Sequence, residues 1–324
     1  MVGQNNAKQI CPRRLRFCAT AAVFACMFGV LSASPAAADD VRAVRRHVEY
    51  LAAIQPARNH RNLLSLETAV KYITREIKPF TQQIRLEEFK VKQRTYKNVI
   101  ANIGPRDADI IVLGAHYDVC GDQPGADDNA SGVAGLLLIA KYLAANQASL
   151  KNNFELIFYS LEEPPHFRTE FMGSAVHAAN LKKRGARVKF MISLETIGYY
   201  SDAKGSQSYP PMLGLFYPSE GNFIALVGRS SDSILIDFLK VGFMKSTKLK
   251  LISLAAPSVI TGIDFSALLN YWKHGWPAVM VTDTAFMRNQ NYHEQTDTPD
   301  TLDYQKIVEV ARGVFGAAAR PYRK

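Results

Sequence analysis

The feature that most constrains the fold of this 324-residue chain is an alternation of short apolar runs with helical stretches. The apolar runs are typical of strands, and the stretches between them carry apolar residues at helical spacing. This alternation predicts an α/β fold, a three-layer sandwich in which helices cover both faces of a mostly parallel mixed sheet. The apolar runs span residues 110–114, 154–159, 189–194, 223–227, 249–254 and 278–282, and the helical stretches span 132–145, 174–184, 232–240 and 304–319.

The part of the chain before this alternation predicts two helices and a hairpin. Residues 40–54 and 63–78 have apolar positions at helical spacing, and residues 82–103 alternate apolar and polar side chains as paired strands do. We find no internal repeat and no low-complexity linker that would divide the chain. Residues 39–324 are therefore expected to form one domain, long but within the range of single α/β units.

Residues 1–38 predict a secretory signal peptide. Basic residues at positions 8–16 precede an apolar run over 17–33, and three alanines end at Ala38. A basic start, an apolar centre and a small-residue cleavage site are the three parts of such a signal. We expect cleavage after Ala38, export to the periplasm or the medium, and no stable membrane insertion afterwards. Because the apolar run is rather long, an uncleaved membrane anchor is the alternative.

The charge of the chain argues against a nucleic-acid partner. The net charge of +10 becomes +6 on the mature chain, because residues 1–38 hold four basic and no acidic residues. No block of Lys and Arg interleaved with aromatic residues suggests a nucleic-acid site. Three of the four cysteines also lie in residues 1–38. Cys120 therefore has no partner for an internal disulfide, and we expect no role for it in the site.

Six metal-binding side chains stand where apolar runs give way to loops. Four of them directly follow a predicted strand, one lies in a loop rich in small residues, and one follows the last apolar run after a short loop. Because ligands collect at the carboxyl ends of strands in such sheets, we expect these side chains to meet in space. The six residues are His116, Asp127, Glu162, Glu163, Glu195 and His293.

The types of these side chains predict zinc and metal-assisted hydrolysis. Two neutral imidazoles and several carboxylates, with no Cys among them, suit a borderline ion such as Zn²⁺. Six groups are too many for one catalytic zinc, which takes three protein ligands and water, and they are about right for two ions that share a carboxylate. Taken singly, His116 fits an ordinary loop, and the Asp127–Asp128 pair fits a helix cap.

The adjacent carboxylates and two neighbouring residues suggest a division of roles. Glu162 and Glu163 close a buried strand, a poor place for two negative charges unless a cation compensates them; a surface-exposed pair is the alternative. One carboxylate can bind metal while the other takes a proton from bound water. Asp118, or the backbone beside it, can fix the tautomer of His116. Tyr292 offers an O–H group to a developing oxyanion, or it simply packs.

Six motifs in this order resemble the co-catalytic di-zinc aminopeptidases. That superfamily includes bacterial leucyl aminopeptidases, glutamate carboxypeptidase and glutaminyl cyclase. The resemblance covers roughly residues 95–310, and the motifs together are far more specific than any one of them. The motifs are GAHYD at 114–118, PGADDNASG at 124–132, EE at 162–163, MGS at 172–174, ETIGY at 195–199 and YHxxxD at 292–297.

The resemblance implies a set of ligands for two zinc ions. His116 and Glu195 would hold one ion, Glu163 and His293 would hold the other, and Asp127 would bridge them. Glu195 stands where many members of the family have Asp, so the ligand type is kept but the side chain is one methylene longer.

The resemblance also implies the catalytic groups. Glu162 would be the general base, Asp118 would orient the first histidine ligand, and Tyr292 would be the oxyanion donor. Many relatives have a Ser-Asp-His motif ahead of the last strand, whereas residues 266–271 of this chain read SALLNY, without the Asp-His pair. That pair is not a zinc ligand in the family, so its loss puts rate and substrate preference in doubt rather than metal binding.

We therefore expect an exported metallo-aminopeptidase with two zinc ions, acting on a peptide or an aminoacyl small molecule. Two alternatives stay open. One is a glutaminyl-cyclase-type acyltransferase, which uses one zinc ion and no attacking water. The other is a binding domain of the same fold that is catalytically impaired.

Overall fold

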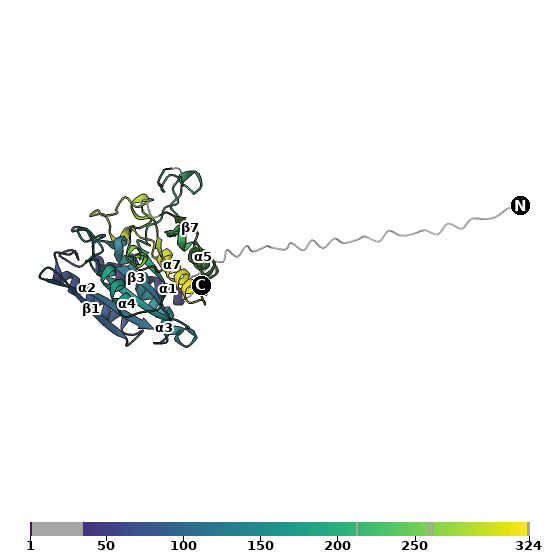
Figure 1. The fold of residues 1–324 in the computed structure, drawn as a ribbon. Coiled ribbons are helices and arrows are strands. Elements are labelled where there is room, and N and C mark those ends of the chain that lie inside the picture. Colours follow the sequence, from purple (N-terminus) through teal and green to yellow (C-terminus); the bar gives the residue numbers. More distant parts are fainter. Residues whose placement is uncertain (2–34, 212, 258–259, 261, 323–324) are drawn as a thin grey trace. The chain divides into compact units, whose positions relative to one another are not determined.

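In the part of the chain that the structure describes, eight strands form one mixed sheet in the order β1-β2-β4-β3-β5-β8-β6-β7. Figure 1 shows the fold and labels β1, β3 and β7 among these strands. The computed structural model describes residues 1, 35–211, 213–257, 260 and 262–322. Within these residues, four neighbouring strand pairs are parallel and three, β1/β2, β2/β4 and β6/β8, are antiparallel. The strands are β1 (Ile84–Val91), β2 (Arg94–Ile103), β3 (Ile110–His116), β4 (Asn153–Tyr159), β5 (Val188–Glu195), β6 (Ile224–Arg229), β7 (Leu251–Ala256) and β8 (Ala278–Thr282).

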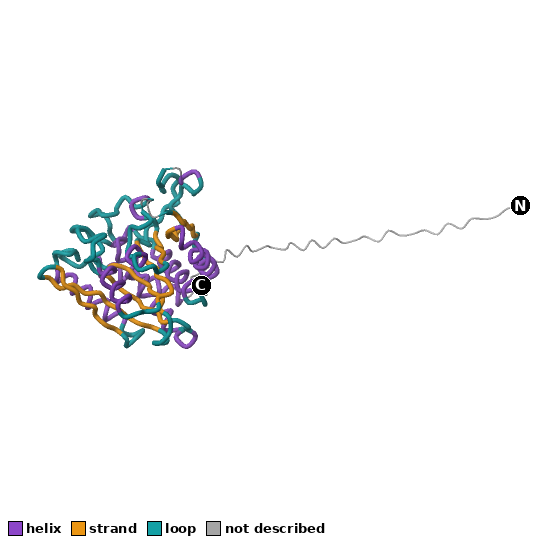
Figure 2. The backbone as a smooth tube through the Cα atoms, viewed as in Figure 1, coloured by secondary structure: helices purple, strands orange, loops and turns teal. Residues whose placement is uncertain are grey.

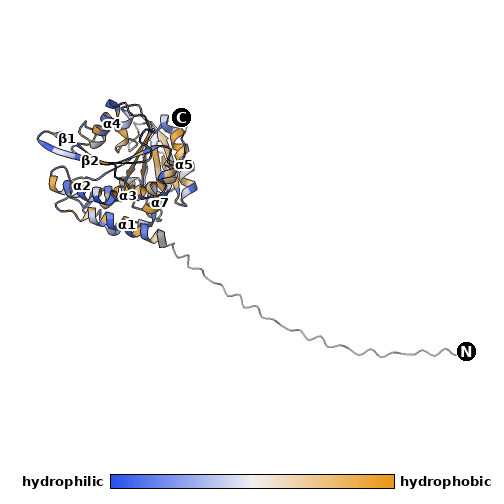
Figure 3. Cartoon of the chain, turned by 90° about the horizontal axis from the view of Figure 1, so that it is seen from below, coloured by the Kyte–Doolittle hydropathy of each residue, from blue (hydrophilic) through white to orange (hydrophobic). Residues whose placement is uncertain are grey.

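Helices cover both faces of the sheet, which is the middle of three layers (Figure 2, Figure 3). Helices α1, α2, α3, α5 and α7 share one buried apolar cluster with the strands, and α4 and α6 share the cluster on the other face. The helices are α1 (Pro35–Ala52), α2 (Leu63–Ile77), α3 (Gly132–Ala145), α4 (Gly173–Lys183), α5 (Ser233–Ser246), α6 (Leu268–Trp272) and α7 (Tyr304–Ala318).

Strand β3 illustrates why the central strands read as unbroken apolar runs. All seven of its residues are buried. Ile111 and Leu113 pack into the cluster beneath α3, whereas Ile110 and Val112 pack into the cluster on the opposite face. Successive side chains of a strand point to opposite faces, so a strand covered on both sides needs an apolar residue at every position.

The architecture confirms the predicted α/β sandwich with a mostly parallel mixed sheet. Each strand and helix expected from the sequence is present, with ends that differ by a few residues. The sequence does not predict the five-residue helix α6, because so short a helix shows too little of the helical period to be recognised.

The predicted signal peptide lies mostly outside the described residues. Of residues 1–38, only residue 1 and residues 35–38 are described, and the latter belong to the first turn of α1. Among the described residues, no helix is both long enough and apolar enough to cross a membrane.

Candidate metal centre

The parallel strands β3, β4 and β5 end at the same edge of the sheet, and their loops converge there with the segment that follows β8. This convergence brings five metal-binding side chains into one connected cluster. Each of the two imidazoles lies within 3.4 Å of two carboxylates. The five residues are His116, Asp128, Glu163, Glu195 and His293.

The distances divide the cluster into two halves joined by Asp128. The Nε2 atom of His116 lies 2.9 Å from Oε1 of Glu195 and 3.2 Å from Oδ1 of Asp128. The Nε2 atom of His293 lies 3.0 Å from Oδ2 of Asp128 and 3.4 Å from Oε2 of Glu163. One oxygen of Asp128 therefore faces each histidine, as a bridging carboxylate must.

Asp128 lies between the two histidines, whereas the sequence resemblance implies this bridging position for Asp127. Both oxygens of Asp127 already accept hydrogen bonds at 2.9 Å, from the backbone N–H of Gly198 and from the side-chain amide of Asn289. The oxygens of Asp128 are buried and accept no well-formed hydrogen bond within the described part of the chain. The two adjacent carboxylates point in different directions, so only one of them faces the cluster.

Two residues without a role in the sequence analysis hold the Asp128 loop in place. The carboxylate of Asp297 accepts the backbone N–H groups of Asp127 and Asp128 at 2.8 and 3.0 Å. The buried guanidinium of Arg58 donates to the carbonyls of Pro124 and Gly125, at the start of the same loop. Asp297 ends the last of the resembling motifs, but no spacing marks Arg58, which lies far away in sequence.

Asp118 contacts three residues of the candidate site. Its backbone carbonyl lies 3.1 Å from Nδ1 of His116, with the carboxylate 3.6 Å from the same atom. A proton on Nδ1 leaves the lone pair of Nε2 free to face the cluster. The carboxylate of Asp118 accepts the backbone N–H groups of Glu162 and Glu163 at 3.1 and 3.2 Å. The orienting contact to His116 thus comes mainly from the backbone, and the side chain positions the glutamate pair.

The glutamate pair is buried, which rules out the surface-exposed alternative. Glu162 and Glu163 are 6% and 4% exposed. Burial raises the pKa of both carboxyls well above the usual range, and neighbouring carboxylates raise it further. Oε2 of Glu162 lies 3.9 Å from Nε2 of His116, so Glu162 stands at the cluster without making its closest contacts.

Neighbouring groups of opposite charge shift the pKa values of His116 and Asp128 in the directions expected for ion pairs. Burial lowers the pKa of His116, but the carboxylates of Glu195, Asp118 and Asp128 outweigh burial and raise it well above its ordinary value. Burial raises the pKa of Asp128, but the imidazoles of His116 and His293 outweigh it and hold this pKa below the ordinary value. The five residues of the cluster include three carboxyl groups, and a bound cation would favour their ionised forms despite their burial.

The unpaired atoms of the site fit a bound metal. Eight buried side-chain polar atoms lack a hydrogen-bond partner in the described residues, and four of them belong to this cluster: both oxygens of Asp128, Oε1 of Glu163 and Nε2 of His293. Buried polar groups are nearly always paired, so their concentration here calls for a partner. Nitrogen and oxygen donors of these types suit zinc.

Ser266 holds the side chain of Glu195 in the cluster. The hydroxyl of Ser266 donates to Oε2 of Glu195 at 2.7 Å and lies 2.6 Å from the hydroxyl of Ser193. These contacts leave Oε1 of Glu195 for the cluster. Ser266 begins the stretch that lacks the Asp-His pair of the resembling family, and both Ser266 and Glu195 are buried.

Tyr292 and an apolar pocket adjoin the cluster. The ring of Tyr292 stacks on that of His293 with centroids 3.9 Å apart, and burial raises the pKa of its hydroxyl well above the usual range, which keeps it a neutral donor. Tyr292 and Glu195 form part of the wall of a pocket that is otherwise mostly aliphatic and aromatic. The apolar lining includes Leu213, Phe223, Val227, Leu254, Phe265 and Met280.

An α/β sandwich with imidazoles and carboxylates at the carboxyl edge of its sheet is an arrangement typical of metal-dependent hydrolases. The particular family follows from the sequence. The chain belongs to peptidase family M28, whose family model matches residues 98–318. Its coarse class is therefore that of the peptidases.

Two relatives illustrate the range of similarity. "Uncharacterized protein YfbL" of Escherichia coli is 44% identical over 281 residues, which cover 84% of this chain and 85% of that protein. "Probable leucine aminopeptidase 1" of Trichophyton verrucosum is 26% identical over 231 residues, which cover 68% of this chain. The match spans only 56% of that aminopeptidase, so its activity does not transfer directly to this protein.

Solved structures support the fold. Legionella LapA superposes with a TM-score of 0.70 at 17% identity, over 88% of this chain and 74% of that one. Fimbriiglobus ruber glutaminyl cyclase superposes with a TM-score of 0.67 at 16% identity, over 87% of this chain and 95% of that one. At these identities the likeness concerns the fold alone.

Proposed function

We propose that this protein is an exported zinc-dependent aminopeptidase that hydrolyses N-terminal peptide bonds. Membership of peptidase family M28 and the leucine aminopeptidases among its relatives support a peptidase reaction. The observation that carries the proposal is the position of Asp128, whose two unpaired oxygens lie 3.2 and 3.0 Å from two different histidines. A carboxylate placed in this way serves two ions rather than one.

Each ion would be held by its own pair of residues and by one shared carboxylate. His116 and Glu195 would hold one zinc ion, Glu163 and His293 would hold the other, and Asp128 would bridge both. When bound, the ions would supply Lewis acidity and make a water molecule more acidic.

Glu162 is the general base of this proposal. Its carboxylate is buried beside the cluster, and its backbone N–H is held by the carboxylate of Asp118. It would take the proton of the attacking water and pass it to the leaving amine. Tyr292 would donate its hydroxyl to the carbonyl oxygen as negative charge develops there, because it borders both His293 and the pocket.

The apolar pocket would receive the side chain of the substrate's first residue. Its lining includes Glu195 and Tyr292 together with apolar residues of β6, β7 and β8. Burying an aliphatic side chain in such a lining contributes about 1.5–3 kcal/mol. The proposed substrate is therefore a peptide or an aminoacyl small molecule with an apolar amino-terminal residue.

Metal content and turnover together test this function. We expect two zinc ions per chain by elemental analysis, and release of aniline from leucine anilide by the zinc-loaded protein. A single fully occupied ion with cyclisation of an N-terminal glutamine peptide would favour the cyclase alternative. Two ions without turnover of any aminoacyl anilide would favour the impaired binding domain.

Export is tested at the amino terminus. We expect the protein isolated from a periplasmic extract to begin at Asp39, because the small residues that end at Ala38 follow the apolar run directly. Amino-terminal sequencing measures this. A chain that still begins near Met1 and sediments with membranes would instead indicate an anchor.

A further inference from the structure

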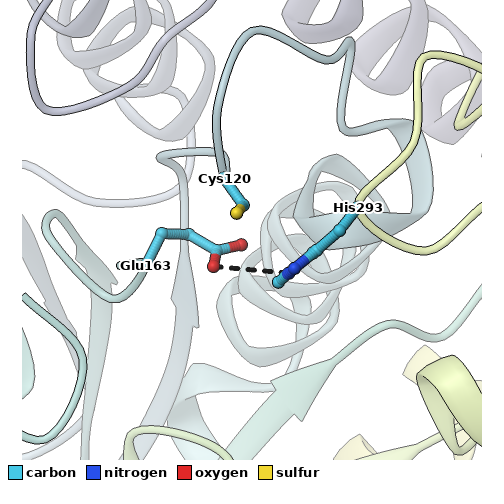
Figure 4. A group of neighbouring side chains, drawn as sticks. All are labelled: Cys120, Glu163 and His293. Carbon is cyan, nitrogen blue, oxygen red and sulfur yellow. Dashed lines mark ion pairs between the residues drawn. The ribbon is translucent and has the colours of Figure 1, made fainter. Parts of the chain in front are cut away.

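Cys120 lies beside the half of the metal centre formed by Glu163 and His293. It sits in the loop after β3, two residues beyond Asp118, and is partly buried. One ligand atom of each of the three residues lies within 4.8 Å of the other two. Figure 4 shows the sulfur of Cys120 and the imidazole of His293 facing the carboxylate of Glu163.

The unpaired carboxylate of Glu163 is an independent sign of a ligand at this place. Glu163 is only 4% exposed, yet its Oε1 atom has no hydrogen-bond partner among the described residues. The distance of 3.4 Å between its Oε2 atom and Nε2 of His293 also fits a shared ion. In a tetrahedral zinc site with bonds of about 2.0–2.3 Å, neighbouring ligand atoms lie roughly 3.3–3.8 Å apart. The sulfur of Cys120, within 4.8 Å of a ligand atom of each of these two residues, would complete such a site by moving inward.

We propose that Cys120 is a fourth protein ligand of the zinc ion at the Glu163–His293 half. This inference rests on the proposed two-metal centre and adds sulfur to a set of ligands otherwise made of nitrogen and oxygen. The thiol loses its proton to solvent as the sulfur–metal bond forms, so atoms and charge balance.

With the thiolate bound, the two ions have different numbers of protein ligands. The ion held by Glu163, His293, Asp128 and Cys120 has four protein ligands, which is the closed arrangement of structural zinc. The ion held by His116, Glu195 and Asp128 has three and keeps the open position that catalytic zinc requires. Glu162 stands 3.9 Å from His116, on the open half. The attacking water therefore belongs to the half where the base already lies.

X-ray absorption at the zinc edge tests the inference directly. The full chain is prepared with Cys11, Cys18 and Cys26 changed to Ser, which leaves Cys120 as its only thiol. Loaded with zinc(II) alone, it should show one sulfur neighbour per two zinc ions, at about 2.3 Å. Loaded with cobalt(II) alone, it should show a sulfur-to-cobalt charge-transfer band in the near ultraviolet.

Cys120→Ser in this background should abolish the sulfur neighbour and the charge-transfer band. The affinity of one of the two ions should fall at least about tenfold, since loss of even an outer partner of a metal ligand costs that much. Ser149→Cys added to Cys120→Ser is the matched control. Ser149 is exposed beside the amino end of β4, at the opposite edge of the sheet, so its thiol should restore neither signal.

Alkylation gives a readout that does not depend on how a variant folds. Iodoacetamide should modify Cys120 in the metal-free protein, and zinc should protect it. Two bound zinc ions with nitrogen and oxygen neighbours only, and a thiol equally reactive with and without zinc, would overturn the role of Cys120 and leave the proposed function intact. Failure of the protein to bind two ions at all would instead contradict the proposed function itself.

Discussion

Glu162→Gln is expected to keep both metal ions and to lose about 10² to 10⁴-fold in turnover, the usual contribution of a general base. The amide preserves the size of the side chain and its hydrogen bonding but cannot take a proton from water. The backbone contact between Glu162 and Asp118 is unaffected, so the loop should keep its position. Hydrolysis of leucine anilide and the metal content of the same preparation measure the two effects.

Glu163→Gln is the matched control for this change, because the two residues are adjacent and equally buried. Here a neutral amide replaces an anionic ligand, so one of the two ions should bind more weakly. Its activity should return in part with excess zinc, whereas added zinc should not rescue Glu162→Gln. Near-normal turnover of Glu162→Gln with both ions bound would show that the base lies elsewhere.

Asp128→Asn is expected to remove the connection between the two halves of the centre. Both oxygens of Asp128 face histidines, so the substitution takes a negative charge away from two ions at once. We expect fewer than two zinc ions per chain and a loss of activity of more than about a hundredfold, beyond the range for loss of an outer partner. Elemental analysis and anilide hydrolysis provide the measurement.

Asp127→Asn should behave differently, although it changes the neighbouring residue in the same way. One of its oxygens accepts an amide proton of Asn289, and a new amide group there would leave two donors facing each other. An unsatisfied buried donor costs about 1–3 kcal/mol, so the melting temperature should fall while both ions stay bound. If Asp127→Asn lost its zinc and Asp128→Asn kept it, our assignment of the bridge would be reversed.

The strands and most helices of this protein could be predicted from the sequence, because burial of a segment requires apolar residues at positions that are close together in the chain. Strand β3 needs an apolar residue at every position, and that run is visible without knowledge of its neighbours. Most residues of helix α3 are likewise buried, and its apolar side chains make the helix recognisable in the sequence. No local sequence pattern indicates the order of the strands in the sheet, because that order depends on pairings between residues far apart in the chain.

The candidate ligands were recognisable for a similar reason. His116 and Glu195 end strands, and parallel neighbours deliver such residues to one edge of the sheet. In the structure these two side chains do meet, with Nε2 of His116 2.9 Å from Oε1 of Glu195. The metals themselves, the general base and the export of the chain stay predictions.

The choice between Asp127 and Asp128 was beyond the sequence. The two residues are chemically identical neighbours, and only the tertiary structure supplies the groups that separate them. Gly198 and Asn289, from segments more than 70 residues away, occupy the oxygens of Asp127 and leave those of Asp128 free. Composition and periodicity report what each residue can do, whereas the direction of a side chain is decided by the partners that folding brings to it.

Cys120 gives the clearest separation of the two kinds of information. The sequence determined that residues 39–324 hold a single cysteine, and therefore that no disulfide can form within this segment. It also determined the α/β class and the kinds of ligand available. Only the tertiary structure brought the thiol to Glu163 and His293, because three loops from different parts of the chain meet there. The sequence determines which chemical groups the chain contains. Only folding brings these groups close enough together to form a site.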